Sequence, residues 1–392
     1  MKNGKTIQDN ERKIVLAICY DFDKTLSPDD MQAQGFIQSV GFNVKEFWEK
    51  SNKLASDNEM DQNLAYMFTM IKTSIGKEFI TRERLKKYGS EVQLFNGLED
   101  WFRRINEYGI ALGVLVEHYV ISSGLREMIE GTRIAKEFRK IYASSYYFDE
   151  TGVAQWPAQA INYTNKTQFL FRIEKGILEI NDQAVNERVP EERIRVPFRN
   201  MVYIGDSDTD IPCMKLVNQY GGHSVGVFNP ETGDKNKVFK MIRQNRIRFF
   251  APADYSDGSD LDLLIKSIID HTAENERLED IHLKNRLEQE SFNKSQDENE
   301  QEIVRVKNDG ILDLESSLSF SNTHAVIDKI RKIDNWNTNE IEMLFDIGLK
   351  NSQIRYILDD LDVANFYRRL LNSTECKKDS EKAIEIEKLI NS

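Results

Sequence analysis

The chain of 392 residues contains little cysteine, no long apolar run and no excess of positive charge. Its three cysteines, Cys19, Cys213 and Cys376, include no C-x-x-C pair and no even-numbered set, which excludes a disulfide framework. Because Cys19 lies inside an apolar run and Cys213 follows a proline at a predicted helix start, we interpret both as small core residues.

The absence of long apolar runs and the excess of acidic residues argue against a membrane protein and against a protein that coats nucleic acid. The longest apolar runs have the length of a strand, far below the roughly 18 residues that a membrane helix needs. The first residues, MKNGKTIQDNERK, lack the apolar centre of a signal peptide. The net charge of −12, from 53 basic and 65 acidic residues, argues against a protein that coats nucleic acid. We therefore expect a cytoplasmic protein without a membrane segment.

Short apolar runs alternate with helical patterns along residues 13–270. The runs are apolar without interruption, as is typical of parallel strands that helices cover on both faces. Strands that alternate with helices indicate an α/β fold with a Rossmann-like parallel sheet. The strands are predicted at 14–20, at 119–121 with an upstream run at 112–116, and at 201–204, and the helices at 97–109 and 125–140.

Composition divides the rest of the chain. Residues 27–96 show the pattern of amphipathic helices inserted over the end of the sheet, and 274–302 hold ten acidic and four basic side chains. Near the C-terminus, Asn337 and Glu340 form a predicted capping box. The predicted domains are a sheet core at 1–26 plus 97–272, a helical cap at 27–96, an acidic linker or solvated helix at 273–310 and a helical bundle at 311–392.

Two aspartates, Asp21 and Asp23, directly follow the first strand in the stretch KIVLAICYDFDKTLSP. The carboxyl ends of parallel strands are where α/β proteins bind ligands, and this spacing can send both side chains toward one pocket. Two like charges so close repel each other, which predicts a bound cation or a shared proton. A solvated turn with a helix cap is the alternative, because D-x-D-x-T alone is a short pattern.

The second strand ends in another polar stretch, VISSGLREMIEG. Ser122 is placed at the strand end, and Ser123 with Gly124 is predicted to open a helix. A hydroxyl group beside free backbone N–H groups at a helix N-terminus is typical of a phosphate site. A simple serine N-cap is the alternative interpretation.

The third strand ends in IGDSDTD. Gly205 is predicted to let the chain turn sharply, and Asp206 and Asp210 are predicted to face the same sheet edge. Pro212 fits the first turn of the next helix, which places Asp210 at the strand-to-helix corner. Carboxylates at this edge suit Mg²⁺, a hard cation that prefers oxygen ligands.

Over roughly residues 13–270, the chain resembles the haloacid dehalogenase superfamily. The four motifs of that superfamily are matched, in order, by DFDKT, Ser122, Lys166 and GDSDTD. A helical cap between the first and second motifs, as at 27–96, is similar to the phosphoserine-phosphatase-like branch. The chain departs from the family at Ser207, where many relatives carry Gly. It also has some forty residues between the third and fourth motifs, part of which is interpreted as a small insertion.

The resemblance implies a Mg²⁺-dependent phosphatase that hydrolyses a phosphomonoester through an aspartyl-phosphate. In that scheme Asp21 is the nucleophile and Asp23 is the general acid and base. The implied phosphate-binding set is Ser122, Ser123, Gly124 and Lys166.

The resemblance also implies a metal site and its support. The Mg²⁺ ligands would be Asp21, the backbone carbonyl of Asp23, and Asp206. Thr25 would support the turn, and Asp210 would orient either the waters of the metal or the lysine of the third motif.

Two alternative functions, one enzymatic and one regulatory, are also consistent with the sequence. A phosphomutase or another phosphotransferase of the same superfamily is the nearest enzymatic one. The other is a regulatory or scaffold protein in which the helical C-terminus binds a partner and controls the phosphatase core. The expected partner is a phosphorylated small molecule, and 311–392 is the segment for self-association or for a protein partner.

Overall fold

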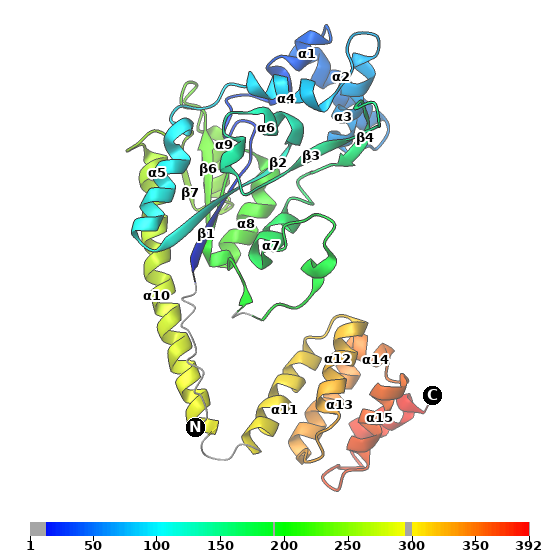
Figure 1. Ribbon diagram of the computed structural model, residues 1–392. Helices are drawn as coiled ribbons and strands as arrows, with labels where there is room; N and C mark the ends of the chain where they lie inside the picture. Colours follow the sequence, from blue (N-terminus) through cyan, green and yellow to red (C-terminus); the bar gives the residue numbers. More distant parts are fainter. Residues whose placement is uncertain (1–12, 191–192, 295–299, 392) are drawn as a thin grey trace, which may run out of the picture. The chain divides into compact units, whose positions relative to one another are not determined.

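The computed structural model describes residues 13–190, 193–294 and 300–391, and it divides the chain into two compact units, Met1–Glu279 and Asp280–Ser392. Figure 1 gives the order of the elements along the chain. The N-terminal unit contains the sheet and every residue of the predicted site, and the C-terminal unit is helical over its described part. Within the described ranges, no helix combines the length and the apolarity that crossing a bilayer requires.

A seven-stranded sheet forms the centre of the N-terminal unit, with the strand order β4-β3-β2-β1-β5-β6-β7. Neighbouring strands are parallel, except for β3 and β4, which form an antiparallel hairpin. This architecture confirms the predicted α/β fold with a Rossmann-like sheet. The strands are β1 (Ile14–Tyr20), β2 (Val114–Leu125), β3 (Lys140–Phe148), β4 (Ala154–Gln159), β5 (Met201–Gly205), β6 (His223–Phe228) and β7 (Phe249–Pro252).

Strand β1 is the central strand, and its neighbours are β2 and β5. Its register with β2 runs from Ile14 opposite Val114 to Tyr20 opposite Val120. Even-numbered residues of β1 face one apolar cluster and odd-numbered residues face another. Both faces are therefore buried, which explains the uninterrupted apolar run in the sequence. Cys19 is buried in the second cluster, as predicted.

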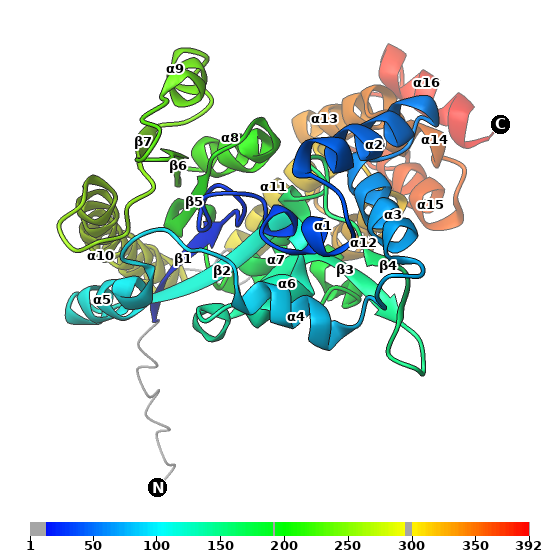
Figure 2. The same ribbon diagram turned by 90° about the horizontal axis from the view of Figure 1, so that it is seen from above.

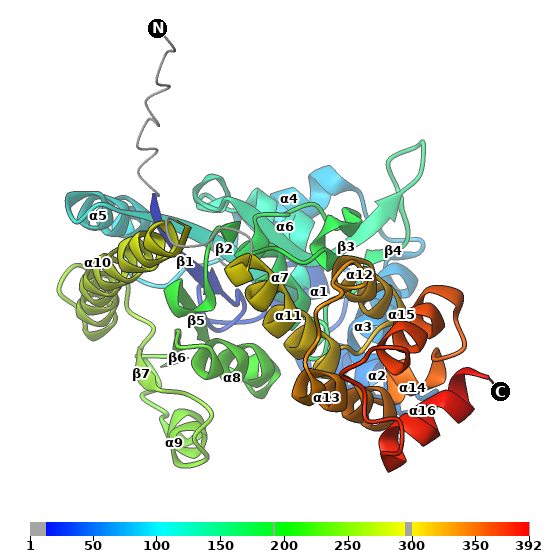
Figure 3. The same ribbon diagram turned by 90° about the horizontal axis from the view of Figure 1, so that it is seen from below.

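Helices cover both faces of the sheet. Helices α5 (Leu98–Ala111) and α10 (Asp260–Lys294) contribute to the first cluster, and α7 (Thr167–Lys175), α8 (Ile211–Gln219) and α9 (Asn236–Arg243) contribute to the second. Figures 2 and 3 show α5 and α10 on one side of the sheet and α8 on the opposite side. Since both faces are covered, a ligand can reach the strands only at their ends.

The predicted cap segment, 27–96, is helical and lies over the carboxyl ends of the central strands (Figure 1). Phe36, Phe47 and Met67 of this segment are buried in the first cluster, and Trp48 packs against it. They are core residues, and none of them lines the pocket described below. The elements are a 3-10 turn (Met31–Ala33), α1 (Phe36–Ser39), α2 (Val44–Asp57), α3 (Gln62–Ser74) and α4 (Arg82–Ser90).

The predicted helix at 125–140 is wrong for most of its length. Helix α6 contains only Arg126–Gly131, a 3-10 turn follows at Ala135–Glu137, and β3 begins at Lys140. Helix α6 packs directly on α4, because a Cβ at Gly131 would lie 2.0 Å from the carbonyl oxygen of Lys86. The periodic pattern continues past this contact, but the helix ends there.

The C-terminal unit is built on one apolar cluster, to which each helix from residue 300 onward contributes. The predicted capping box is present, with the Glu340 N–H donating to Asn337 Oδ1 at 3.0 Å and the Asn337 N–H donating to Glu340 Oε2 at 2.8 Å. Helix α11 crosses the predicted domain limit between 310 and 311, and α10 crosses the one between 272 and 273. The helices are α11 (Glu300–Glu315), α12 (Phe320–Ile330), α13 (Thr338–Lys350), α14 (Ser352–Tyr356), α15 (Leu361–Leu371) and α16 (Glu381–Ile390).

Candidate active site

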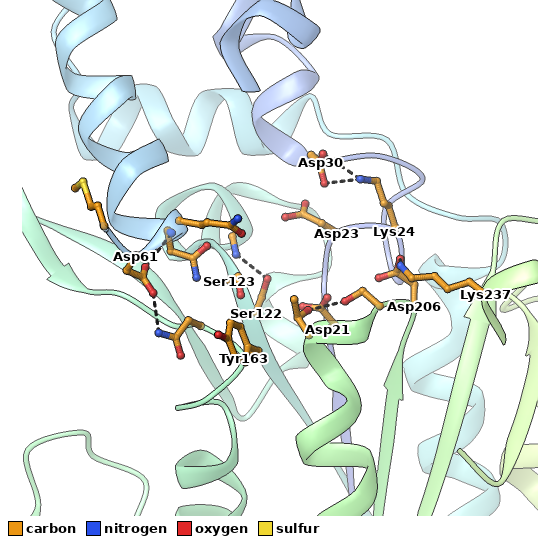
Figure 4. Close-up of a pocket in the computed structure, with 17 residues that line it drawn as sticks. Asp21, Asp23, Lys24, Asp30, Asp61, Ser122, Ser123, Tyr163, Asp206 and Lys237 are labelled. Carbon is orange, nitrogen blue, oxygen red and sulfur yellow. Dashed lines mark hydrogen bonds and ion pairs between the residues drawn. The ribbon is translucent and has the colours of Figure 1, made fainter. Parts of the chain in front are cut away.

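A cavity of about 470 Å³ opens between the strand ends and the cap. Figure 4 shows that carboxylates from β1 and β5 face serines from β2 across this space. Three other predicted residues, Thr25, Lys166 and Asp210, are fully buried and do not line the cavity. The predicted residues that do line it are Asp21, Asp23, Ser122, Ser123, Gly124 and Asp206.

Lys166 joins two of the predicted motifs beneath the cavity floor. Its Nζ lies 3.1 Å from Asp21 Oδ1 and 2.7 Å from Asp210 Oδ1. Burial alone would lower the pKa of Lys166, but the charges of Asp21 and Asp210 outweigh burial and raise it above the ordinary value. Lys166 is therefore a permanent buried cation between two carboxylates.

Asp210 is held on both of its oxygens by protein groups. Besides Lys166, the Tyr203 hydroxyl donates to Oδ1 at 2.9 Å, and the N–H and Oγ of Ser207 donate to Oδ2 at 3.2 and 3.0 Å. The departure at Ser207 thus adds a hydrogen bond to this carboxylate. Since its oxygens are already occupied, Asp210 suits a supporting role better than that of a metal ligand.

Gly205 has a different role from the predicted one. It lacks a positive φ, so the turn does not require its conformational freedom. A Cβ at this position would lie 2.5 Å from Asp210 Oδ2. The structure needs glycine here because the carboxylate of Asp210 packs against the strand backbone.

Asp21, Asp206 and Asp210 form an acidic cluster in which one oxygen of each lies within 4.8 Å of the others. Burial raises the pKa of Asp21 to about 7, with Asp210 adding to the effect and Lys166 opposing it. Burial likewise raises the pKa of Asp206 to about 6, against the opposing charge of Lys237. Buried carboxylates that favour protonation when no cation is bound are a donor set that fits a hard divalent cation.

Asp23 occupies the cavity wall between the strand end and the cap. Its Oδ1 accepts the Met31 N–H at 2.9 Å. Burial raises the pKa of Asp23 well above its usual range, and the charges of Asp30 and Asp21 add to this. A carboxyl group with a raised pKa keeps its proton to higher pH and can act as a proton donor.

The loop after Asp23 is tightly wound. Lys24 adopts a φ of 59° and pairs with Asp30 at 2.9 Å. Thr25 lies in the turn with its N–H donating to the Phe22 carbonyl at 3.2 Å. The Thr25 hydroxyl is buried without a hydrogen-bond partner among the described residues, so the predicted support comes from its backbone.

The predicted helix opening at Ser123 and Gly124 is wrong, because β2 continues to Leu125. The Gly124 N–H is not free in this structure, since it donates to Ser122 Oγ at 3.0 Å. A Cβ on Gly124 would lie 2.8 Å from Asp23 Oδ2 and 3.3 Å from Ser122 Oγ. Glycine therefore allows the proposed acid and the proposed phosphate ligand to approach each other.

The cavity also contains residues that the sequence reasoning missed. Lys237 of α9 lies 3.3 Å from Asp206 Oδ2, and Tyr163 is 57% exposed at the cavity mouth. Asp61 carries the sequence signal of an N-cap before α3, and three of the other missed residues, Lys24, Ser207 and Thr209, lie within the first and fourth motifs. The full set of missed lining residues is Lys24, Asp30, Met60, Asp61, Gln62, Asn63, Asn162, Tyr163, Ser207, Thr209 and Lys237.

The stretch interpreted as an insertion lies away from the cavity. Between α7 and β5 the described residues form the 3-10 turns Gln183–Asn186 and Phe198–Asn200, and none of them lines the cavity. This departure therefore leaves the arrangement of the motifs unchanged.

This arrangement is the one that the sequence resemblance to the haloacid dehalogenase superfamily implies. A mostly parallel sheet carries the first motif on β1, the second on β2 and the fourth on β5, and the third-motif lysine reaches the first-motif aspartate from the start of α7. The cap type and the roles of the individual residues stay predictions.

Comparisons with known proteins give distant matches. No family model matches the chain. An uncharacterized protein from Borreliella burgdorferi is 27% identical over 278 residues, which cover 64% of this chain and 95% of that protein. The rest of this chain therefore has no counterpart there.

The solved structures that are similar to this chain include hydrolases. A haloacid dehalogenase family hydrolase from Salmonella enterica serovar Typhi matches with a TM-score of 0.43 and 14% identity, over 64% of this chain and 70% of that one. A probable phosphoserine phosphatase from Vibrio cholerae matches with 0.44 and 12%, over 69% of each chain. A phospho-aspartyl intermediate analogue of phosphoserine phosphatase matches with 0.39 and 17%, over 65% of this chain and 99% of that one. Similarity at this level gives no information on activity.

Proposed function

We propose that the protein is a Mg²⁺-dependent phosphatase that hydrolyses a phosphomonoester through an aspartyl-phosphate on Asp21. One observation carries the proposal. Lys166 Nζ lies 3.1 Å from Asp21 Oδ1 and 2.7 Å from Asp210 Oδ1, and this buried lysine fixes Asp21 in the floor of a cavity that Asp23 and Ser122 also line. A buried carboxylate beside a fixed cation suits attack on a phosphate anion.

In the first step, a carboxylate oxygen of Asp21 attacks phosphorus and the bond to the leaving oxygen breaks. Asp23 gives its proton to the departing alkoxide, which leaves as an alcohol. The raised pKa of Asp23 keeps that proton in place until it is needed. The Ser122 hydroxyl and the amide of Ser123, which line the cavity, hold the transferring oxygens, and Lys166 stabilises negative charge from beneath Asp21.

In the second step, Asp23 is ionised and takes a proton from a water molecule. The water oxygen attacks phosphorus, the bond to Asp21 breaks and inorganic phosphate is released. Asp23 is thereby protonated again, so both carboxyl groups return to their starting states. One side chain serves both steps because it lies beside the nucleophile without being bonded to Lys166.

Asp21, Asp206 and the backbone carbonyl of Asp23 are the groups that would hold Mg²⁺. When bound, Mg²⁺ supplies positive charge that offsets the repulsion between carboxylates and a phosphate anion. Asp210 fixes Lys166 from below and does not compete for the cation, because Lys166, Tyr203 and Ser207 occupy its oxygens.

The dimensions of the cavity favour a phosphorylated small molecule as the substrate. About 470 Å³ lies within the range of roughly 300–1,000 Å³ that small-ligand sites occupy. The wall opposite the acidic floor is polar and includes Gln62, Asn63 and Tyr163. These groups can hydrogen-bond a hydroxylated leaving group.

The proposal is tested by hydrolysis of an aryl phosphate with the full chain, with Mg²⁺ or with EDTA. We expect turnover that needs Mg²⁺, that Asp21→Asn abolishes, and that is accompanied by hydroxylamine-labile phosphate on the wild-type protein. Asp208→Asn is the matched control, because Asp208 is exposed in the loop next to Asp206 and does not line the cavity. Absence of Mg²⁺-dependent turnover, or full activity of Asp21→Asn, would refute the proposal. Phosphate transfer to an added alcohol at the expense of hydrolysis would instead favour a phosphotransferase or phosphomutase.

We also propose that the C-terminal unit mediates self-association. It has an apolar cluster of its own, and its surface carries Leu318, Tyr356 and Leu361 with 89%, 83% and 78% of their areas exposed. Light scattering of the full chain, with and without serine at these three positions, tests the idea. A wild-type mass equal to one chain would refute it.

A further inference from the structure

Asn162 connects the cap to the turn that carries Lys166. Its Nδ2 donates to Asp61 Oδ2 at 2.7 Å, although 101 residues separate the two along the chain. Asp61 is the N-cap of α3, where its Oδ1 accepts the N–H groups of Asn63 and Leu64 at 2.9 and 3.0 Å. Both Asn162 and Asp61 line the cavity, and Figure 4 shows Asp61 near Tyr163 at the side away from Asp206.

The other end of the Asn162 side chain organises the turn before α7. Its Oδ1 accepts the N–H groups of Thr164 and Asn165 at 2.9 and 3.1 Å, and the Thr164 hydroxyl at 2.6 Å. The backbone carbonyl of Asn162 accepts the N–H of Lys166 at 3.1 Å. One residue thus defines the turn from which the lysine side chain departs.

The orientation of the Asn162 amide follows from its partners. The backbone N–H groups of Thr164 and Asn165 can only donate, so the oxygen must face them. The NH₂ group therefore faces Asp61, whose carboxylate can only accept when it is ionised. The two halves of this side chain hold different elements and cannot exchange roles.

Two further contacts fix the start of α3 against the core. Asn63 Nδ2 donates to the carbonyl of Ile161 at 2.5 Å, next to Asn162 in the chain. The Tyr66 hydroxyl, one turn further along α3, donates to the carbonyl of Ser123 at 2.8 Å. The start of α3 is thereby tied both to the strand of the second motif and to the turn of the third.

We propose that Asn162 is a positioning residue that, through Asp61, fixes the turn of Lys166 to the cap and so keeps Lys166 between Asp21 and Asp210. A lysine side chain has four rotatable bonds, so the place of its ammonium group depends on where its backbone is held. The proposal rests on the phosphatase function proposed above. It makes the rate of the chemical step depend on a hydrogen bond at the cavity mouth that takes no part in the reaction.

Asn162→Asp is the main test, because the two atoms of the amide have separable roles. An aspartate keeps the oxygen that organises the turn, but it loses the donor and places a second carboxylate against Asp61. We expect kcat for an aryl phosphate to fall between about tenfold and a hundredfold, the loss that a small misplacement of a catalytic group causes. KM should change less than kcat, because the cavity wall is retained.

The exchanged pair Asp61→Asn with Asn162→Asp provides the rescue. The amide introduced by Asp61→Asn can keep the cap acceptor and donate to the new carboxylate at position 162, so the hydrogen bond reforms with its direction reversed. We expect kcat to return to within about threefold of the wild type, since the coupled pair is restored. Asn43→Asp is the control, because Asn43 is an exposed N-cap of the same kind at α2 and lies outside the cavity.

Each result of these experiments either supports or overturns the proposed role of Asn162. Full activity of Asn162→Asp overturns the proposal, and so does a loss that the exchanged pair does not restore. If Asn162→Asp fails to fold, Asp61→Asn decides, since it keeps the cap acceptor and loses only the acceptor for Asn162, and an unchanged kcat overturns the proposal. Amide hydrogen exchange of residues 162–170 tests the turn without any activity, and equal exchange rates in wild type and Asn162→Asp overturn the proposal. Absent wild-type turnover, in contrast, refutes only the phosphatase function.

Discussion

Replacing the proposed nucleophile should stabilise the metal-free protein. Burial raises the pKa of Asp21 from the ordinary value of 3.8 to about 7. A carboxyl group whose folded-state pKa is raised contributes stability that is present below its unfolded pKa and is lost as the pH rises through the folded pKa. Asp21 therefore destabilises the fold increasingly between pH 3.8 and about 7, and by the full amount above that, where it is ionised in the folded state. Asn resembles the protonated form and removes this dependence.

The size of the effect follows from the two pKa values. A difference of about 3 between 7 and 3.8, at about 1.36 kcal/mol for each pH unit, gives about 4 kcal/mol at pH 8. At pH 4.5 the same two values leave only about 1 kcal/mol. We therefore expect the free energy of unfolding of Asp21→Asn to exceed that of the wild type by up to about 4 kcal/mol at pH 8, and by much less at pH 4.5.

Urea unfolding in EDTA, followed by tryptophan fluorescence at both pH values, measures this difference. Three of the four tryptophans, Trp48, Trp101 and Trp156, belong to the N-terminal unit and report on the sheet core. Asp208→Asn controls for the loss of one negative charge near the site. Equal stability of Asp21→Asn and wild type at pH 8, or a gain that does not shrink at pH 4.5, would refute the electrostatic reasoning.

Three further variants test other parts of the structure. Gly205→Ala places a Cβ 2.5 Å from Asp210 Oδ2, so we expect a loss of about 1–3 kcal/mol in urea unfolding and a lower kcat, and wild-type values would contradict the close packing. Lys166→Met leaves two buried carboxylates without their cation, which should lower the free energy of unfolding by about 3–5 kcal/mol at pH 8 in EDTA, and a loss under about 1 kcal/mol would argue against the pair. The hydrogen bond and charge of Asp362 raise the pKa of His324, so protonated His324 stabilises the C-terminal unit at low pH and this is lost as the pH rises through the raised pKa. His324→Gln should lower the melting temperature at pH 5.5 but not at pH 9, and an equal effect at both would exclude the ion pair.

The sheet and the four motifs could be predicted from the sequence because local patterns encode them. The apolar run of β1 has no polar face, which only a strand covered on both sides can have. Parallel strands end at a common edge, so Asp21, Ser122 and Asp206 had to lie near one another once the strands were assigned. The common strand edge alone therefore predicts that these three side chains lie close together, without information on side-chain contacts.

The cap side of the cavity could not be predicted because it depends on contacts between distant segments. Asp61 and Asn162 are ordinary turn and cap residues, and only the antiparallel β3–β4 hairpin brings their segments together. The strands of this hairpin, at 140–148 and 154–159, are not among the predicted elements, and the helical pattern at 125–140 continues beyond Gly131, where α6 ends in close contact with α4. A periodic sequence pattern does not encode contacts between distant segments, so tertiary packing can end a helix that the pattern predicts to continue.

The electrostatics of the candidate site connect its stability to its proposed function. Asp21 and Asp210 share the buried cation Lys166, while the ion pair of Asp206 is with Lys237, whose side chain is 45% exposed. The acidic cluster therefore keeps uncompensated negative charge when no metal is bound, and strands β1 and β5 hold the carboxylates together against this repulsion. A cation that binds the folded state alone stabilises it by an amount that grows with the logarithm of the ratio of its concentration to its Kd. The same repulsion that destabilises the metal-free fold would thus favour binding of the proposed divalent cation, and the buried strands β1 and β5 hold the carboxylates in place against it.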